Sequence, residues 1–226
     1  MLSLLATVNA VNKSVWLWSG DLFGYPTGGP VNATILERFL DATASLSDVV
    51  DTVSPCAFYL ADPANDTILN STGGLVLKQG SESVIQGLQS LGKFRVEPLI
   101  GTIPTVDTIA QLRYYYQGAG RDSFVKACVR AVRQWDLDGL NFDFEPRDCA
   151  TATNCTTSGD GVAFASLLSE VRAAIRAVNP DARVSIDTGQ SNVARLVRFW
   201  SIAATLVLIS NKRCYFDFTV VSLMQY

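Results

Sequence analysis

Short runs of strand-forming residues alternate with amphipathic helical patterns along most of this 226-residue chain. Such alternation is typical of βα units, in which parallel strands form a sheet that helices cover. Five strands are expected at residues 13–18, 53–60, 94–100, 137–144 and 184–187, and a sixth at 218–226. The sequence therefore predicts an α/β fold built on a parallel sheet.

The helices between these strands are marked by apolar residues at helical spacing. The clearest helix opens near Gly161, carries Phe164, Leu168 and Val171 on one face, and ends before Pro180. Other helices are expected at residues 34–46, 84–91 and 124–135, with a short one near residues 109–112. Residues 62–80 are expected to form a polar loop, and residues 195–211 fit neither pattern clearly.

The chain length limits how many βα units can be present. A (β/α)8 TIM barrel takes about 250 residues, roughly 31 for each unit, so a 226-residue chain with long loops accommodates six or seven. The chain also stops inside or at the end of a strand. We therefore expect one partial TIM-barrel domain of about six strands over residues 11–226, truncated at its C-terminal side.

Composition and charge exclude several classes of function. Lys and Arg number 18 and Asp and Glu number 21, so no basic surface marks a site for nucleic acid or an anionic membrane. The apolar stretch at residues 199–210 is shorter than the roughly 20 residues of a membrane helix. The chain has no histidine, which excludes Ser-His-Asp and Cys-His nucleophiles and removes the usual zinc ligands. We expect a monomer without metal or cofactor, in which carboxylates, Tyr, Lys or Cys perform any acid–base chemistry.

Several features favour passage through the secretory pathway, to the outside or to the lysosome. Residues 1–10 are apolar and end in a small-residue pattern, which fits a signal remnant or an ordinary lead into a strand. Cys149 and Cys155 bracket a Thr-rich loop that a disulfide would hold, and the odd total of five cysteines leaves at least one unpaired within the chain. Five asparagines stand in the N-glycosylation pattern: Asn12, Asn32, Asn65, Asn70 and Asn154.

The segment around the fourth expected strand carries the most chemical information. Leu140, Phe142 and Phe144 alternate with three polar residues, Asn141, Asp143 and Glu145. A period of two predicts a strand with the apolar side chains toward the helices and the polar ones toward the barrel lumen. Asp143 and Glu145 would lie roughly 6–7 Å apart along the strand. Two such acids favour sharing one proton, which provides a general acid near neutral pH. Alternatively, the three polar residues alternate with apolar ones only because they lie on the solvent-exposed face of an edge strand.

Asp138, Asn141, Asp143 and Glu145 together resemble the DxxDxDxE signature on the fourth strand of family 18 glycoside hydrolases, the chitinase family. Asn141 stands where that signature has its second Asp, as in the chitobiase-like branch. Met224 and Tyr226 are similar to the family's M-x-Y motif on the sixth strand. The family's Ser-x-Gly-Gly motif on the third strand is not evident, because residues 97–101 contain one Gly. The seventh and eighth strands of the family barrel are missing.

The resemblance implies a retaining glycosidase that uses no enzyme nucleophile. Glu145 would protonate the leaving oxygen while the N-acetyl group of the substrate attacks the anomeric carbon. Asp143 would orient the acetamide, and Tyr226 would donate a hydrogen bond to its oxygen. Asn141 would hydrogen-bond within the same row, and Asp138 would support the strand. The expected substrates are therefore chitin, chito-oligosaccharides or an N-glycan core.

Other candidate residues lie near the ends of expected strands. Trp16 and Trp18, with Phe58 and Tyr59, would stack on sugar rings or simply fill the core. Asp187 follows the fifth strand, where it would bind substrate or cap a turn. Two other functions stay open: a chitinase-like lectin that binds sugar without cleaving it, and an inactive fragment. Lectin-like relatives commonly lose the acid at the position of Glu145, and this chain keeps it.

Overall fold

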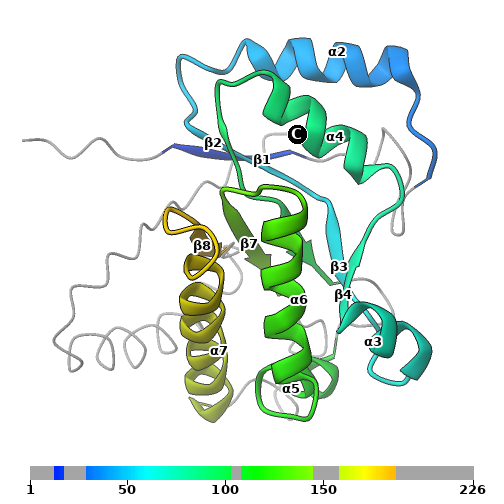
Figure 1. Ribbon diagram of the computed structural model, residues 1–226, viewed down its shortest axis with the longest axis vertical. Coiled ribbons are helices and arrows are strands. Elements are labelled where there is room, and N and C mark those ends of the chain that lie inside the picture. Colours follow the sequence, from blue (N-terminus) through cyan, green and yellow to red (C-terminus); the bar gives the residue numbers. More distant parts are fainter. Residues whose placement is uncertain (1–12, 18–28, 103–107, 145–157, 187–226) are drawn as a thin grey trace, which may run out of the picture.

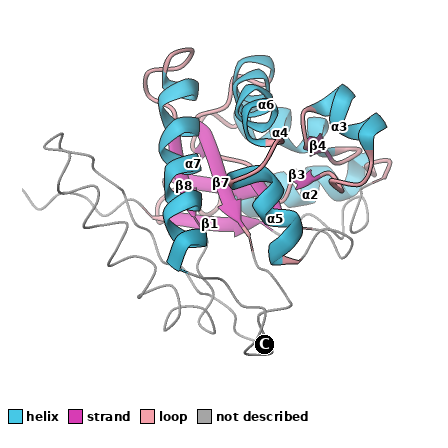
Figure 2. Cartoon of the chain, turned by 90° about the horizontal axis from the view of Figure 1, so that it is seen from below, coloured by secondary structure: helices cyan, strands magenta, loops and turns pink. Residues whose placement is uncertain are grey.

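A computed structural model describes residues 13–17, 29–102, 108–144 and 158–186. Over these ranges the chain alternates strands and helices, and the helices lie around the strands (Figures 1 and 2). The strands are β1 (Ser14–Leu17), β2 (Thr52–Pro55), β3 (Phe58–Leu60), β4 (Leu75–Leu77), β5 (Arg95–Val96), β6 (Leu99–Gly101), β7 (Gly139–Asp143) and β8 (Arg183–Ile186). The helices are α2 (Ala33–Ala44), α3 (Asp66–Thr72), α4 (Ser81–Ser90), α5 (Ile109–Tyr116), α6 (Arg121–Gln134) and α7 (Ser158–Arg176).

The strands form two sheets, in the orders β1-β2-β5 and β4-β3-β6-β7-β8. All neighbours are parallel except β3 and β4. The predicted strand at 53–60 appears as β2 and β3, and the one at 94–100 as β5 and β6, where Pro98 lacks the N–H that a regular ladder needs. Hydrogen bonds at the interruptions, from Cys56 N to Leu17 O (3.2 Å) and from Glu97 N to Val53 O (3.0 Å), keep the neighbouring segments together.

The five expected strands up to residue 187 are thus present in parallel order, which confirms the α/β prediction. Within the described residues both sheets are open: β1 and β5 are the edge strands of one, and β4 and β8 are the edge strands of the other. The expected strand at 218–226, the start of the chain and the proposed Cys149–Cys155 bridge lie outside the described residues. The described cysteines, Cys56 and Cys128, are both buried.

The prediction of a polar loop at 62–80 was wrong, because this segment contains α3 and β4. The Asn65 side chain accepts a hydrogen bond from Ile68 N (3.2 Å) and so caps the start of α3. Gly73 ends the helix with a left-handed φ of 69°. Leu75 and Leu77 then pair with β3. A side chain at Gly74, whose φ is 92°, would collide with the ring of Tyr115.

The main core lies between the parallel strands and helices α5, α6 and α7. Its centre is a chain of aromatic contacts in which Phe124 of α6 meets Phe142 of β7 at 6.3 Å between ring centroids. Phe142 is 5.6 Å from Phe144, which is 5.4 Å from Phe164 of α7. Helices α6 and α7 pack side by side over this cluster (Figure 1). None of the helices in the described ranges is long and apolar enough to cross a membrane.

Candidate functional site

The candidate site lies on the face of β7 that is turned away from the helices. Leu140 and Phe142 are fully buried in the helix-side core. Because neighbouring strand residues point to opposite faces, Asn141 and Asp143 share the other face. Asn141 is buried, whereas Asp143, at the carboxyl end of the strand, is half-buried. The alternation predicted from the sequence therefore places these two polar side chains together on the lumen side.

Asn141 is held by a chain of hydrogen bonds that crosses three neighbouring segments. Its Nδ2 donates to Ser185 Oγ on β8 (3.0 Å). Ser185 Oγ in turn donates to Glu97 Oε2, in the link between β5 and β6 (3.1 Å). The register of β7 and β8 sets Asn141 directly beside Ser185. We call Asn141, Ser185 and Glu97 the lumen network.

Glu97 is an ionisable residue in the link between β5 and β6, with only 3% of its surface exposed. Burial raises its pKa, although Arg95, the Ser185 hydroxyl and Arg183 each act in the opposite direction. Arg95 Nε lies 3.5 Å from Glu97 Oε1, and the same guanidinium donates to the backbone oxygens of Asp138 (3.0 Å) and Asp181 (2.8 Å). Glu97 is therefore a buried acid next to the Arg95 guanidinium, which also binds the segments that lead into β7 and β8.

Sequence reasoning did not single out Glu97 or Ser185. A signal for Glu97 was present, because one acid interrupts the apolar run at 94–100. A charged residue at such a position is rarely buried without a partner. Ser185 gave no signal, since its role depends on the pairing of β8 with β7 across 44 residues of sequence.

Asp138 lies directly before β7, at the opposite end of the strand from Asp143. Its Oδ2 accepts a hydrogen bond from Val96 N (2.8 Å), and its own N–H donates to Val96 O (3.1 Å). These bonds fix β7 against β5. Asp138 is therefore a link between the segment that leads into β7 and β5.

The remaining candidates are distributed as follows. Phe58 is buried in the core, Tyr59 is half-buried and Trp16 is partly exposed on β1. Burial raises the pKa of Tyr59. Among the described residues there is no group of three or more side chains that could hold a metal ion. Five predicted site residues lie outside the described residues: Glu145, Tyr226, Met224, Asp187 and Trp18.

No protein-family profile and no curated protein sequence matches this chain. Among solved structures, catalytic domain 2 of the group II chitinase of Ostrinia furnacalis, determined with a bound N-acetylchitooligosaccharide, has a TM-score of 0.54 at 12% identity. The spore cortex-lytic enzyme SleL of Bacillus cereus has a TM-score of 0.53 at 12% identity, and a chitinase of Chromobacterium violaceum has 0.52 at 13%.

These three matches cover 81%, 79% and 81% of this chain, but only 45%, 35% and 48% of the other chains. The chain thus spans between a third and a half of the length of those structures. At such identities the likeness concerns the fold. The described part of this chain therefore has a chitinase-like fold, the fold implied by its resemblance to the family 18 glycoside hydrolases.

Proposed function

We propose that this chain forms the catalytic part of a glycoside hydrolase that cleaves β-1,4-linked N-acetylglucosamine in chitin, chito-oligosaccharides or N-glycan cores. The observation that carries the proposal is the placement of Asn141 and Asp143 on the lumen face of β7, with Asp143 at its carboxyl end. Active sites of βα barrels lie at this end of the strands. The chitinase-like fold and the carbohydrate bound to one structural neighbour support a sugar as substrate.

The proposed reaction is substrate-assisted and retains the configuration of the anomeric carbon. Glu145, two residues beyond Asp143 in the sequence, protonates the glycosidic oxygen as the bond to the leaving sugar breaks. The acetamide oxygen of the substrate attacks the anomeric carbon, and the resulting oxazolinium carries a positive charge. Asp143 orients the acetamide and stabilises that charge, while Tyr226 donates a hydrogen bond to the acetamide oxygen. Water then opens the ring, with Glu145 acting as the base.

The lumen network provides rigid support for the side chains that perform this chemistry. Asn141 precedes Asp143 by two residues and lies on the same face of β7. Its side-chain amide is linked by hydrogen bonds through Ser185 to the buried carboxyl of Glu97. Catalytic groups act best when neighbouring hydrogen bonds hold them in one geometry. We assign Asn141, Ser185 and Glu97 as positioning residues, which do not contact substrate themselves.

We further propose that the protein is a monomer and travels through the secretory pathway. Asn32, Asn65 and Asn70 are exposed, as N-glycosylation requires. The Asn32 side chain caps α2 by accepting hydrogen bonds from Thr34 N (3.0 Å) and Ile35 N (3.2 Å). A glycan is attached to the side-chain nitrogen, so the oxygen that forms the cap stays available. Glycan occupancy in material from a eukaryotic secretory host tests this part of the proposal.

The deciding experiment is hydrolysis of a fluorogenic di-N-acetylchitobioside by the purified, folded chain and by Glu145→Gln, which keeps the shape and removes the acid. The matched control is Glu82→Gln, an exposed acid in the first turn of α4. We expect turnover in the wild type and the control, and its loss in Glu145→Gln. Sugar binding without turnover in a folded wild-type chain would point to a lectin, and absence of folding would point to a fragment.

A further inference from the structure

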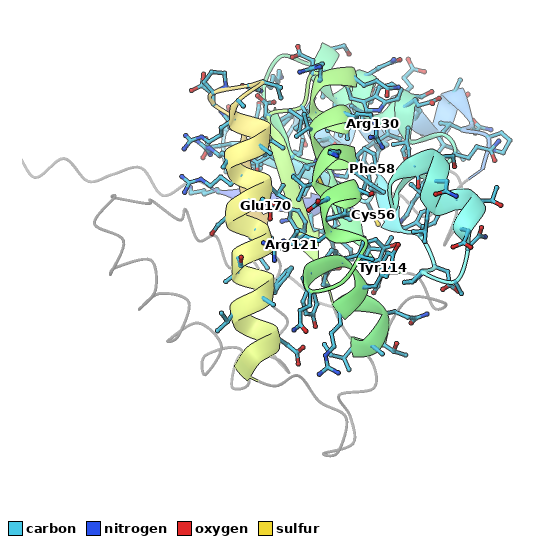
Figure 3. All side chains as sticks on the ribbon, turned by 60° about the horizontal axis from the view of Figure 1, so that its bottom comes forward. Cys56, Phe58, Tyr114, Arg121, Arg130 and Glu170 are labelled. Atoms are coloured by element: carbon cyan, nitrogen blue, oxygen red, sulfur yellow. The ribbon has the colours of Figure 1, made fainter. Side chains whose placement is uncertain are left out.

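The row of paired strand residues that contains Asp143 also contains a tyrosine. Tyr59 of β3 is paired with Gly101 of β6, and Gly101 is paired with Asp143 of β7. The residues one position earlier form the matching row on the helix side and are all buried in the core: Phe58 (labelled in Figure 3), Ile100 and Phe142. Because successive strand residues point to opposite faces, Tyr59 lies on the lumen face, two strands from Asp143.

No side chain stands between Tyr59 and Asp143 in this row. A Cβ atom placed on Gly101 would meet, among the described residues beyond its chain neighbours, only Leu99 Cδ2, at 3.2 Å. Neighbouring strands lie about 4.8 Å apart, so the Cα atoms of Tyr59 and Asp143 are about 10 Å apart. The lumen face over Gly101 is therefore flanked by a phenol on one side and a carboxylate on the other.

The hydroxyl of Tyr59 makes no hydrogen bond within the described part of the chain, although the residue is half-buried. Two tyrosines of α5 differ from it. The hydroxyl of Tyr115 donates to Ala61 O, and that of Tyr116 donates to Asp160 Oδ1 (3.4 Å). Tyrosine hydroxyls usually find a partner when they are buried. A phenylalanine would fill the position of Tyr59 equally well, so packing explains its ring but not its hydroxyl.

The chemistry of the Tyr59 phenol suits a polar ligand in the lumen. Burial raises the pKa of Tyr59, so the hydroxyl keeps its proton in neutral and mildly alkaline solution and stays a hydrogen-bond donor. The same oxygen can also accept a hydrogen bond. Sugar hydroxyls both donate and accept, and binding sites orient such ligands with a few polar groups on a largely apolar wall.

We propose that Tyr59 is a substrate-binding residue whose hydroxyl forms a hydrogen bond with a ring hydroxyl of the N-acetylglucosamine unit that Asp143 holds. This inference rests on the proposed function. The sugar lies over Gly101, with its acetamide toward Asp143 and the rest of its ring toward Tyr59. Because a ring hydroxyl takes no part in bond breaking, this contact stabilises bound substrate and transition state equally. Tyr59 therefore sets the affinity for the sugar and not the rate of the chemical step.

The test measures binding apart from turnover. Glu145→Gln removes the proposed acid, so the Kd for di-N-acetylchitobiose can be measured by calorimetry without hydrolysis. Tyr59→Phe, added to that variant, keeps the ring and removes only the hydroxyl. We expect the Kd to rise about 3- to 10-fold, as for the loss of one neutral hydrogen bond. In the chain that keeps Glu145, Tyr59→Phe should raise KM by a similar factor and leave kcat within about 2-fold.

The matched control is Tyr114→Phe in α5. The Tyr114 ring, labelled in Figure 3, packs edge-on against Tyr115 at 5.2 Å between centroids, so it belongs to the helix layer and not to the lumen face. Its loss of a hydroxyl should leave the Kd unchanged.

The possible outcomes separate this inference from the proposed function. An unchanged Kd for Tyr59→Phe, in a chain that binds the sugar, would overturn the inference and leave the proposed function standing. A lower kcat with an unchanged Kd would also contradict a binding role. A folded chain that neither binds nor cleaves the sugar would overturn both.

Discussion

Removal of the Ser185 hydroxyl tests the lumen network directly. Ser185→Ala deletes the atom that accepts from Asn141 Nδ2 and donates to Glu97 Oε2. Two buried polar groups each lose a hydrogen bond, which is worth about 0.5–1.5 kcal/mol between neutral groups and about 1.5–3 kcal/mol where one group is charged. We therefore expect the free energy of unfolding to fall by about 2–4 kcal/mol. With a slope of about 2 kcal/mol per molar urea, the unfolding midpoint should fall by about 1–2 M.

The measurement is urea unfolding at pH 7, followed by tryptophan fluorescence. The matched control is Ser185→Thr, which keeps the hydroxyl and suits a strand. Threonine should stay close to wild type, whereas alanine should not. An unfolding midpoint for Ser185→Ala within about 0.3 M urea of wild type would refute the conclusion that the hydrogen bonds of the lumen network stabilise the fold.

Three further predictions concern other parts of the same wall and its helices. Burial raises the pKa of Glu97, so the protonated carboxyl stabilises the fold fully below the ordinary glutamate pKa of 4.5, and this stabilisation is lost as pH rises through the raised folded-state pKa. In urea unfolding at pH 4 to 7, Glu97→Gln should therefore show a smaller decline of the unfolding free energy with pH than wild type. The same pH dependence in both proteins would contradict a raised Glu97 pKa. Arg113 pairs with Asp160, which is 1% exposed, at 2.6 Å and 2.7 Å, while the Arg113 side chain is itself 38% exposed and Gln117 also donates to Asp160 (2.9 Å). Arg113→Met should therefore cost about 1.5–3 kcal/mol in urea unfolding, the range for hydrogen bonds to a charged group. Arg121→Met, whose partner Glu170 is 43% exposed, should cost less than about 1 kcal/mol, and equal losses would show that burial of the acid does not govern these pairs. Asn32→Ala should lose about 1 kcal/mol through the cap of α2, whereas Asn32→Asp keeps the capping oxygen and should stay near wild type in the same assay; equal losses in both variants would argue against the cap.

The parallel order of the strands could be predicted because each βα unit carries its own periodic signal. Residues 139–143 show why: alternating apolar residues must bury one face, so Leu140 and Phe142 point to the helices and Asn141 points away. The pattern is local, and the local geometry of a strand converts it directly into two faces. The prediction of which β7 side chains share a face was therefore secure.

Other features depend on partners distant in sequence. The interruption of the strand at 94–100 follows from Pro98, but the burial of Glu97 beside Ser185 follows from pairings that span 88 residues. Likewise, β4 is a three-residue strand that forms by pairing with the edge of β3, whereas the polar residues around it in the sequence favour a loop. No single-sequence pattern encodes such neighbours.

The hairpin of β3 and β4 also bears on the order in which the sheet forms. Phe58 pairs with Leu77, 19 positions later, whereas Ser14 pairs with Thr52 and Leu99 with Asn141, at separations of 38 and 42. Short-range pairings close small loops and form faster than long-range ones. We expect the hairpin to be the first piece of sheet to assemble, so that β3 and β4 are already paired when the parallel strand β6 docks beside β3.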